Sequence, residues 1–111
     1  MQSRIRGLTA PKSGYLWMTY DLTFREEAKK EWDGLGHVIR AQFKKKLAER
    51  LENPHVPAAK IHGSANRYKI KLRSVGYRLV YEVRDAELVV SVVAVGKRER
   101  NAVYREAVKR S

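Results

Sequence analysis

The feature that most constrains the fold is an almost unbroken apolar run in the second half of the chain, LVVSVVAV at 88–95. A strand with one solvated face alternates apolar and polar residues, whereas a strand covered on both faces reads as a short continuous run rich in valine. Gly96 follows the run and ends it. We therefore expect 88–95 to be a central strand of a sheet that is covered on both faces.

Three segments before this run have their own periodicity. Tyr20, Leu22 and Phe24 alternate with polar residues, which is typical of a short half-buried strand. Two helical stretches follow, with apolar positions at Ala28, Trp32 and Leu35, and then at Ile39, Phe43, Leu47 and Leu51. Pro54 ends the second helix, because a residue before proline disfavours helical conformation. The link between the helices is short, so we expect an antiparallel helical hairpin packed on the sheet.

The stretch YKIKLRSVGYRLVYEV at 68–83 predicts two strands, 68–72 and 77–83. They are joined by a tight turn in which Gly76 supplies an unusual backbone conformation. After the central strand we expect a short terminal helix with an apolar side and a basic side. Its predicted inward residues are Val103, Ala107 and Val108, and its predicted outward residues are Arg100, Arg105, Lys109 and Arg110.

These elements predict an α+β domain with the order β-α-α-β-β-β-α. Its sheet is expected to have four strands, mostly antiparallel, packed against the helical hairpin, with the short helix at the C-terminus. A chain of 111 residues is one domain by length. Residues 1–17 lack a sustained period and are interpreted as a flexible N-terminal extension, so that the folded domain spans 18–111.

The charge balance and composition narrow the range of partners. Lys and Arg number 24 against 12 acidic residues, for a formal net charge of +12, and such an excess favours a polyanionic partner. There is no cysteine, which excludes disulfides and thiolate metal sites. His37, His55 and His62 are scattered without metal-ligand spacing, so we expect no metal and no cofactor. No apolar run is long enough to span a membrane, and we expect a cytoplasmic protein.

One face of the predicted hairpin is almost wholly cationic. Side chains alternate across a strand, so Lys69, Lys71 and Arg73 point to one side and their apolar neighbours to the other. Lysines packed together lower one another's pKa, so that one of them could act as a base. Such a face is either a solvated surface or a phosphate site. The basic segment 97–100 after the central strand, and Tyr104 one helical turn later, favour the phosphate site.

Four blocks of sequence occur in an order that points to a known family: KEW at 30–32, QFKKKLAERLENP at 42–54, YKIKLRSVGYRLVYEV at 68–83 and VGKRERNAVYREAVKR at 95–110. Over 19–110 the chain resembles the RelE family of bacterial and archaeal toxins, the messenger-RNA-cleaving branch of the RelE/ParE superfamily. The resemblance implies a ribosome-dependent endoribonuclease that cuts messenger RNA in the ribosomal A site. In that reaction the 2′-hydroxyl attacks the adjacent phosphate and leaves a 2′,3′-cyclic phosphate and a 5′-hydroxyl.

The resemblance also implies roles for individual residues and a set of partners. The implied catalytic residues are Lys69, Lys71, Arg78, Arg98 and Tyr104. The residues expected to bind RNA around them are Lys60, His62, Arg73, Lys97 and Arg100. His62 stands where the family has a basic residue before a loop glycine. The implied partners are a RelB-like antitoxin, the 70S ribosome with its rRNA, and messenger RNA. The toxin–antitoxin complex is expected to bind its own operator DNA through the antitoxin.

Two other functions remain open. A toxin of the ParE branch would share the fold and inhibit gyrase, although it has no need for a strand of paired lysines. A non-catalytic RNA- or ribosome-binding protein would use the basic face only to neutralise phosphates. The predicted site lacks a histidine or carboxylate of ordinary pKa for proton transfer. That lack fits an enzyme that depends on the ribosome to position the messenger.

Overall fold

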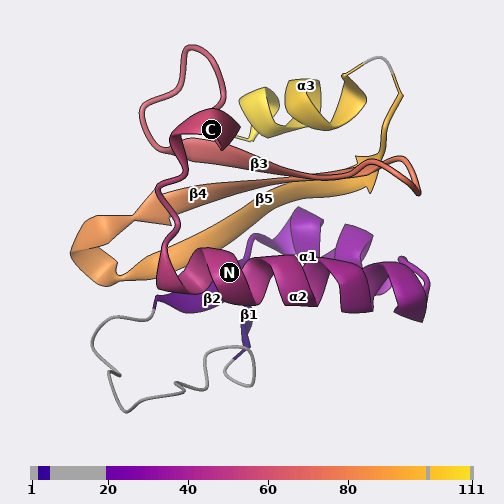
Figure 1. Cartoon of the computed structure of the whole chain (residues 1–111), viewed down its shortest axis with the longest axis horizontal. Helices are drawn as coiled ribbons and strands as arrows, with labels where there is room; N and C mark the ends of the chain where they lie inside the picture. Colours follow the sequence, from indigo (N-terminus) through magenta and orange to yellow (C-terminus); the bar gives the residue numbers. More distant parts are fainter. Residues whose placement is uncertain (1–2, 6–19, 100, 111) are drawn as a thin grey trace.

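The structure of the chain, a computed structural model, describes residues 3–5, 20–99 and 101–110 (Figure 1). The strands are β1 (Ser3–Ile5), β2 (Asp21–Phe24), β3 (Arg67–Leu72), β4 (Tyr77–Arg84) and β5 (Val89–Lys97). The helices are α1 (Glu26–Asp33), α2 (His37–Glu52) and α3 (Ala102–Lys109), with short 3-10 turns at Pro57–Ala59 and Asp85–Glu87. The predicted α+β class and the predicted order of the elements from β2 to α3 are confirmed.

The strands form one sheet in the order β1-β2-β5-β4-β3. β2 and β5 pair in parallel, and the other neighbouring strands pair antiparallel. β5 lies in the middle of the sheet, and its residues from Val89 to Val95 are all buried. The prediction of a central strand covered on both faces is therefore confirmed.

Helices cover both faces of the sheet, with α1 and α2 on one face and α3 on the other (Figure 1). The helical residues buried on the first face are Ala28, Trp32, Phe43, Leu47 and Leu51. Among them the Trp32 ring links sheet to helix, with its centroid 5.0 Å from that of Phe24 and 6.3 Å from that of Phe43. The smaller cluster on the second face consists of Val80, Val93, Ala94, Val103 and Ala107. The α3 helix is therefore held by less apolar contact than the α1–α2 layer.

An irregularity in the pairing of β4 with β5 adapts the sheet to α3. Val80 pairs with Ala94, whereas the next residue, Tyr81, pairs with Val92, so β5 has one extra residue at this point. A bulge of this kind interrupts the strict alternation of side chains. As a result Val93 and Ala94 both belong to the cluster beneath α3.

The turn between β3 and β4 has the predicted geometry. Gly76 has a φ of 71°, a left-handed conformation that glycine adopts without steric penalty. Its N–H donates a hydrogen bond to the Leu72 carbonyl over 2.9 Å. The turn thereby sets the register of the hairpin, in which Leu72 lies opposite Tyr77.

The N-terminal segment contains a strand that the sequence did not predict. Ser3–Ile5 pairs with β2 as β1, so the sheet has five strands instead of four, and part of 1–17 belongs to the sheet. Three residues held by backbone hydrogen bonds leave no periodic signal in their side chains. The remainder of the predicted flexible extension lies outside the described residues. No helix in the described part of the chain is long and apolar enough to cross a membrane.

The terminal helix also differs from its prediction at two positions. Val108, predicted to point inward, is 70% exposed. Arg110, predicted to point outward, has a side chain that is only 10% exposed and pairs with Glu31 of α1. The helix ends at Lys109, so Arg110 no longer follows the helical period and turns back toward the acidic residues of α1. Arg100 lies outside the described residues.

Tyr81 allows a test of how the hairpin is fixed to the helical layer. Its buried hydroxyl donates a hydrogen bond to the Pro54 carbonyl over 2.8 Å and accepts one from Arg50 over 2.9 Å. We expect Tyr81→Phe to lower the free energy of unfolding, measured in urea, by about 1–3 kcal/mol, because both partners lose a buried bond. The control Tyr77→Phe, at a half-buried position of the same strand, is expected to change it by less than about 0.5 kcal/mol. Equal losses would contradict the role of the hydroxyl.

Candidate functional site

Strand pairing brings the cations of the hairpin together. In β3, Ile70 and its buried neighbours face α1 and α2, so Lys69 and Lys71 extend from the opposite face, which carries α3. Lys71 lies opposite Arg78, and Lys69 lies opposite Val80 of the cluster beneath α3. The predicted cationic face is therefore also the face on which the terminal helix packs.

A hollow of about 100 Å³ lies at the end of the hairpin. The residues that line it are Lys71, Leu72, Arg73, Gly76, Tyr77, Arg78 and Arg98. The end of β5 brings Arg98 there, since the Arg98 N–H donates a hydrogen bond to the Gly76 carbonyl over 2.7 Å. Among the described residues, the lining contains four cations and no carboxylate, so the hollow is suited to an anionic ligand.

Tyr104 of α3 packs its ring against Arg78, one of the residues that line this hollow. The guanidinium carbon of Arg78 is 5.1 Å from the centroid of the Tyr104 ring, a cation–π arrangement. Arg78 also donates a hydrogen bond to the side-chain oxygen of Asn101 over 3.1 Å. Burial raises the pKa of Tyr104, and the charge of Arg78 offsets part of that rise. The hydroxyl of Tyr104 is buried and has no hydrogen-bond partner among the described residues.

The cationic neighbours of Lys71 change its pKa. The charge of Lys69 lowers the pKa of Lys71, and desolvation and the charges of Arg78, Arg73 and Arg98 lower it further. The predicted lowering of a lysine pKa by like charges is confirmed in direction. A lysine with a lowered pKa releases its proton more readily, which is what a general base requires.

Lys69 lines a second hollow, next to the first. This hollow is about 330 Å³ and lies along β3, against α2 and the 57–59 turn. The residues that line it are Arg50, Val56, Ala58, Ala59, Lys69, Lys71 and Arg73. Lys71 and Arg73 belong to both hollows. The two hollows therefore form one continuous cationic surface, with an apolar floor at the 56–59 side.

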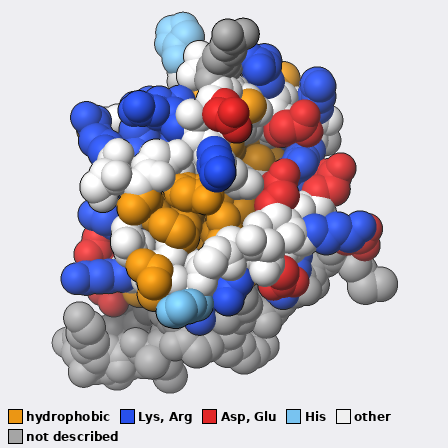
Figure 2. Space-filling view, turned by 90° about the vertical axis from the view of Figure 1, so that its right-hand side faces the viewer, with side chains coloured by type: hydrophobic (Ala, Val, Ile, Leu, Met, Phe, Trp, Pro, Cys, Tyr) orange, Lys and Arg blue, Asp and Glu red, His pale blue; other side chains and the backbone are white. Residues whose placement is uncertain are grey.

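Figure 2 shows the end of the molecule that lies at the right of Figure 1, where the β3–β4 turn, the end of β5 and the start of α3 meet. Lys and Arg side chains gather at the upper left of this face, beside a hydrophobic area in its middle. Other Lys and Arg side chains lie elsewhere on this face, and those toward its right side lie among Asp and Glu side chains, unlike the group at the upper left. Such a distribution is typical of a surface that binds a polyanion at a defined place.

The remaining predicted RNA-binding residues lie farther from the hollow. Lys60 and His62 are exposed in the loop before β3, where Lys60 forms a backbone bridge with Tyr68. Lys97 is exposed and lines a separate depression of about 180 Å³ that also contains Glu99. Arg100 lies outside the described residues. Arg73 is the one member of this predicted set that lines the hollow among the residues the structure describes.

Sequence reasoning missed two residues of the site. Asn101, which precedes α3, has a φ of 62° and accepts the hydrogen bond of Arg78. Its position before a helix and the tolerance of asparagine for left-handed backbone could have indicated it. Arg50 of α2 donates a hydrogen bond to the Lys69 carbonyl over 3.2 Å and lines the second hollow. No sequence signal distinguishes it from the other basic residues of that helix.

Comparison with known proteins identifies the family. A family model described as ParE toxin of type II toxin–antitoxin system, parDE, matches residues 22–102. The mRNA interferase toxin RelE of Escherichia coli is 59% identical over 93 residues, covering 84% of this chain and 98% of the relative. The mRNA interferase RelE of Shigella flexneri matches to the same extent. A structure of an E. coli RelE double mutant in the free state has a TM-score of 0.78 at 57% identity and covers 84% of this chain and 98% of that one.

The chain therefore belongs to the toxins of type II toxin–antitoxin systems that the family model describes. Within them it belongs to the RelE family, because relatives that are 59% identical over nearly their whole length are RelE proteins. The family model has the name of the ParE branch, but the sequence identity to RelE decides between the two branches. The resemblance noted in the sequence is thus confirmed.

The influence of Lys69 on Lys71 can be measured directly. We expect Lys69→Gln to raise the pKa of the Lys71 amine toward its ordinary value, because loss of a neighbouring positive charge favours the protonated form. NMR titration of the Lys71 side chain would record the change. Arg73→Gln, which removes a weaker contribution, is expected to raise it less. An unchanged or lowered Lys71 pKa in Lys69→Gln would contradict the assigned cause.

Proposed function

We propose that this toxin is a ribosome-dependent endoribonuclease that cleaves messenger RNA in the ribosomal A site. The 2′-hydroxyl of one nucleotide attacks the adjacent phosphate and expels the 5′-oxygen of the next. The observation that carries the proposal is the hollow in which Lys71, Arg78 and Arg98 meet, with Tyr104 against Arg78. Its size and charge suit one phosphate, and Tyr104 offers a ring and a hydroxyl to the neighbouring nucleotide. The names of the relatives, mRNA interferases, support the same reaction.

One residue of the site is suited to act as the base, and others are suited to stabilise negative charge. Attack by the 2′-oxygen requires removal of its proton, and Lys71 is suited to this task because its cationic neighbours lower its pKa. Lys69 supplies the largest single part of that effect and a second positive charge for the RNA backbone. Arg78 and Arg98 stabilise the negative charge that develops on the phosphorane.

Among the described residues that line the hollow or contact it, the leaving 5′-oxygen has no strong proton donor. Arginine, with a pKa above about 12, is a poor acid, and burial raises the pKa of Tyr104. The site therefore stabilises charge well and transfers protons poorly. Positioning of the messenger in line by the ribosome can supply about 7 kcal/mol or more of barrier reduction. RNA outside the ribosome is expected to be cut slowly.

Cleavage and simple binding are separated by mapping the 5′ ends of messengers after the toxin is induced. Breaks within codons are expected for a ribosome-dependent nuclease. Intact messengers on arrested ribosomes would favour a non-catalytic ribosome-binding protein, and intact messengers with inhibited gyrase would favour a ParE-like activity.

We also propose that a RelB-like antitoxin neutralises the toxin in the cytoplasm. The intact E. coli RelBE toxin–antitoxin complex contains a chain that matches this one with a TM-score of 0.69 at 55% identity. An E. coli RelE double mutant in complex with a RelB peptide matches with a TM-score of 0.72 at 56% identity. A chain of net charge +12 suits an acidic partner. The complex is expected to bind its operator DNA through the antitoxin.

The α3 helix is the element that an antitoxin is expected to displace. It has eight residues and buries only Val103 and Ala107, so its local stability is low. An antitoxin helix with an apolar stripe and acidic flanks would cover the same cluster and remove Tyr104 from the site.

Hydrogen exchange tests this displacement. We expect amides of 102–110 to exchange faster when the antitoxin is bound, while the strand amides of 68–83 stay protected. Equal or slower exchange in 102–110 would contradict it.

Substitution of the arginines tests their catalytic role. We expect Arg78→Ala and Arg98→Ala each to lower the single-turnover rate of cleavage on ribosomes by on the order of 100-fold, as loss of a charge-stabilising donor does. Ribosome affinity is expected to fall far less. The control is Lys45→Ala, on the exposed side of α2, which is expected to change little. Weaker binding with a normal rate at saturation would contradict the role.

A further inference from the structure

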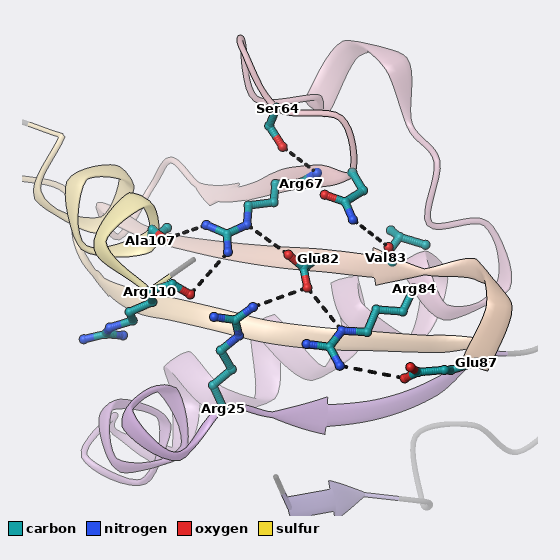
Figure 3. Close-up of polar contacts among 10 residues, drawn as sticks. Arg25, Ser64, Arg67, Glu82, Val83, Arg84, Glu87, Ala107 and Arg110 are labelled. Carbon is teal, nitrogen blue, oxygen red and sulfur yellow. Dashed lines mark hydrogen bonds and ion pairs between the residues drawn. The ribbon is translucent and has the colours of Figure 1, made fainter. Parts of the chain in front are cut away.

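Glu82 of β4 lies at the other end of the cationic face, where its carboxylate pairs with three arginines (Figure 3). Its side chain is 14% exposed and pairs with Arg25 at 3.3 Å, Arg67 at 3.3 Å and Arg84 at 3.2 Å. Burial works to raise the pKa of Glu82, but the Arg84 hydrogen bond and the charges of Arg25 and Arg67 outweigh it, and the pKa is lowered. Glu82 is therefore ionised near neutral pH and fixes three guanidinium groups. These four residues are called the Glu82 cluster below.

Arg67 connects the Glu82 cluster to α3. Its Nε donates to Glu82, and its two terminal nitrogens donate to the carbonyls of Ala107 and Arg110 (Figure 3). The last carbonyls of a helix have no partner within the helix, and a cation beside them is favourable. Arg67 is only 11% exposed, so water screens these bonds little. One side chain thus bridges a buried carboxylate of the sheet and the C-terminal end of the helix.

Arg110 forms a second connection from the same end of α3. Its terminal nitrogens lie 2.9 and 3.0 Å from the two carboxylate oxygens of Glu31 on α1. One of these nitrogens also donates to the Val93 carbonyl over 3.0 Å. The side chain is 10% exposed. The C-terminal end of α3 is therefore attached to both the sheet and α1.

The opposite end of α3 carries Tyr104, which contacts the site through Arg78. Tyr104 lies in the first turn, with its ring against Arg78. A helix of this length is not stable by itself in water; its buried residues are Val103 and Ala107, and Tyr104 is partly buried against the same cluster. The direction of the helix axis, and hence the place of Tyr104, depends on how the C-terminal end is held.

We propose that Arg67, held by Glu82, is a positioning residue for Tyr104 in messenger cleavage. It does not touch the reacting atoms, since it pairs with Glu82 at the far end of the same two strands that carry Lys71 and Arg78. It acts by fixing α3 so that the Tyr104 ring stays against Arg78. This role rests on the proposed cleavage reaction, whereas the effect of Arg67 on α3 does not.

The Glu82 cluster supplies a matched control. Arg84 pairs with the same carboxylate of Glu82, but among the described residues its other ion pair is with Glu87 and not with α3. Arg67→Gln is expected to speed hydrogen exchange of the amides of 102–110 and to lower the single-turnover cleavage rate on saturating ribosomes by roughly 10- to 100-fold. Arg84→Gln is expected to do neither. Equal effects of the two variants on exchange and rate would overturn the proposal.

A double-mutant cycle distinguishes positioning from general destabilisation. If Arg67 acts through Tyr104, Arg67→Gln should lower the cleavage rate little further once Tyr104 has been replaced by alanine. Independent losses that multiply would overturn the proposal. Ribosome affinity is expected to be unchanged in Arg67→Gln, because a rate effect without a binding effect is what misplacement of Tyr104 produces.

Two further measurements apply if Arg67→Gln does not fold or if the wild-type chain does not cleave messengers. If Arg67→Gln does not fold, Arg67→Lys keeps a positive charge beside Glu82 but cannot reach both helix carbonyls, and is expected to show the same faster exchange. If the wild-type chain fails to cleave messengers, the proposed function is wrong. The NMR signals of the Tyr104 ring then still decide whether Arg67 places it. They are expected to shift toward solvent-exposed values in Arg67→Gln and to stay unchanged in Arg84→Gln; unchanged signals in both would overturn the proposal.

Discussion

The pairing of β3 with β4 is the interaction on which both the core and the site depend. One register places Ile70 and Leu79 in the core against the helices and Lys71 and Arg78 side by side on the opposite face. Because side chains alternate along a strand, a slip of one residue would exchange the two faces. It would bury lysines and expose the apolar set. The burial of the core therefore holds like charges together at the site, and this proximity lowers the pKa of Lys71.

The cationic face has two ends with different electrostatics. At the hairpin turn, Lys71, Arg78 and Arg98 surround a hollow with no carboxylate in its lining. At the other end, Glu82 neutralises part of the charge of Arg25, Arg67 and Arg84. The α3 helix spans the distance between these ends, with Tyr104 at one and the Arg67 bonds at the other. The positive charge around the hollow can therefore bind a phosphate, whereas the paired charge at Glu82 attaches the C-terminal end of α3 to the sheet.

The sequence predicted the elements whose signal is local. The valine run of β5, the glycine of the turn and the alternation of Lys69 and Lys71 each report a property of neighbouring residues, and the structure confirms them. The strand Ser3–Ile5 was missed because backbone pairing leaves no side-chain pattern. Arg110 was misplaced because its partner Glu31 is on another helix. In the Glu82 cluster, Arg25 and Arg67 are likewise far from Glu82 in the chain, and no spacing along the sequence encodes these pairs.

The parallel pairing of β2 with β5 has a consequence for the order in which parts of the chain fold. Residues 21–24 pair with 89–92, so the central pairing of the sheet closes a loop that contains α1, α2 and the hairpin. A contact between such distant residues is formed late, because the entropy of loop closure must be offset before it contributes. It also has to wait until β5 has been synthesised. The site draws on β5 and α3, which follow the hairpin in the chain, so it is assembled only after these later elements have been made.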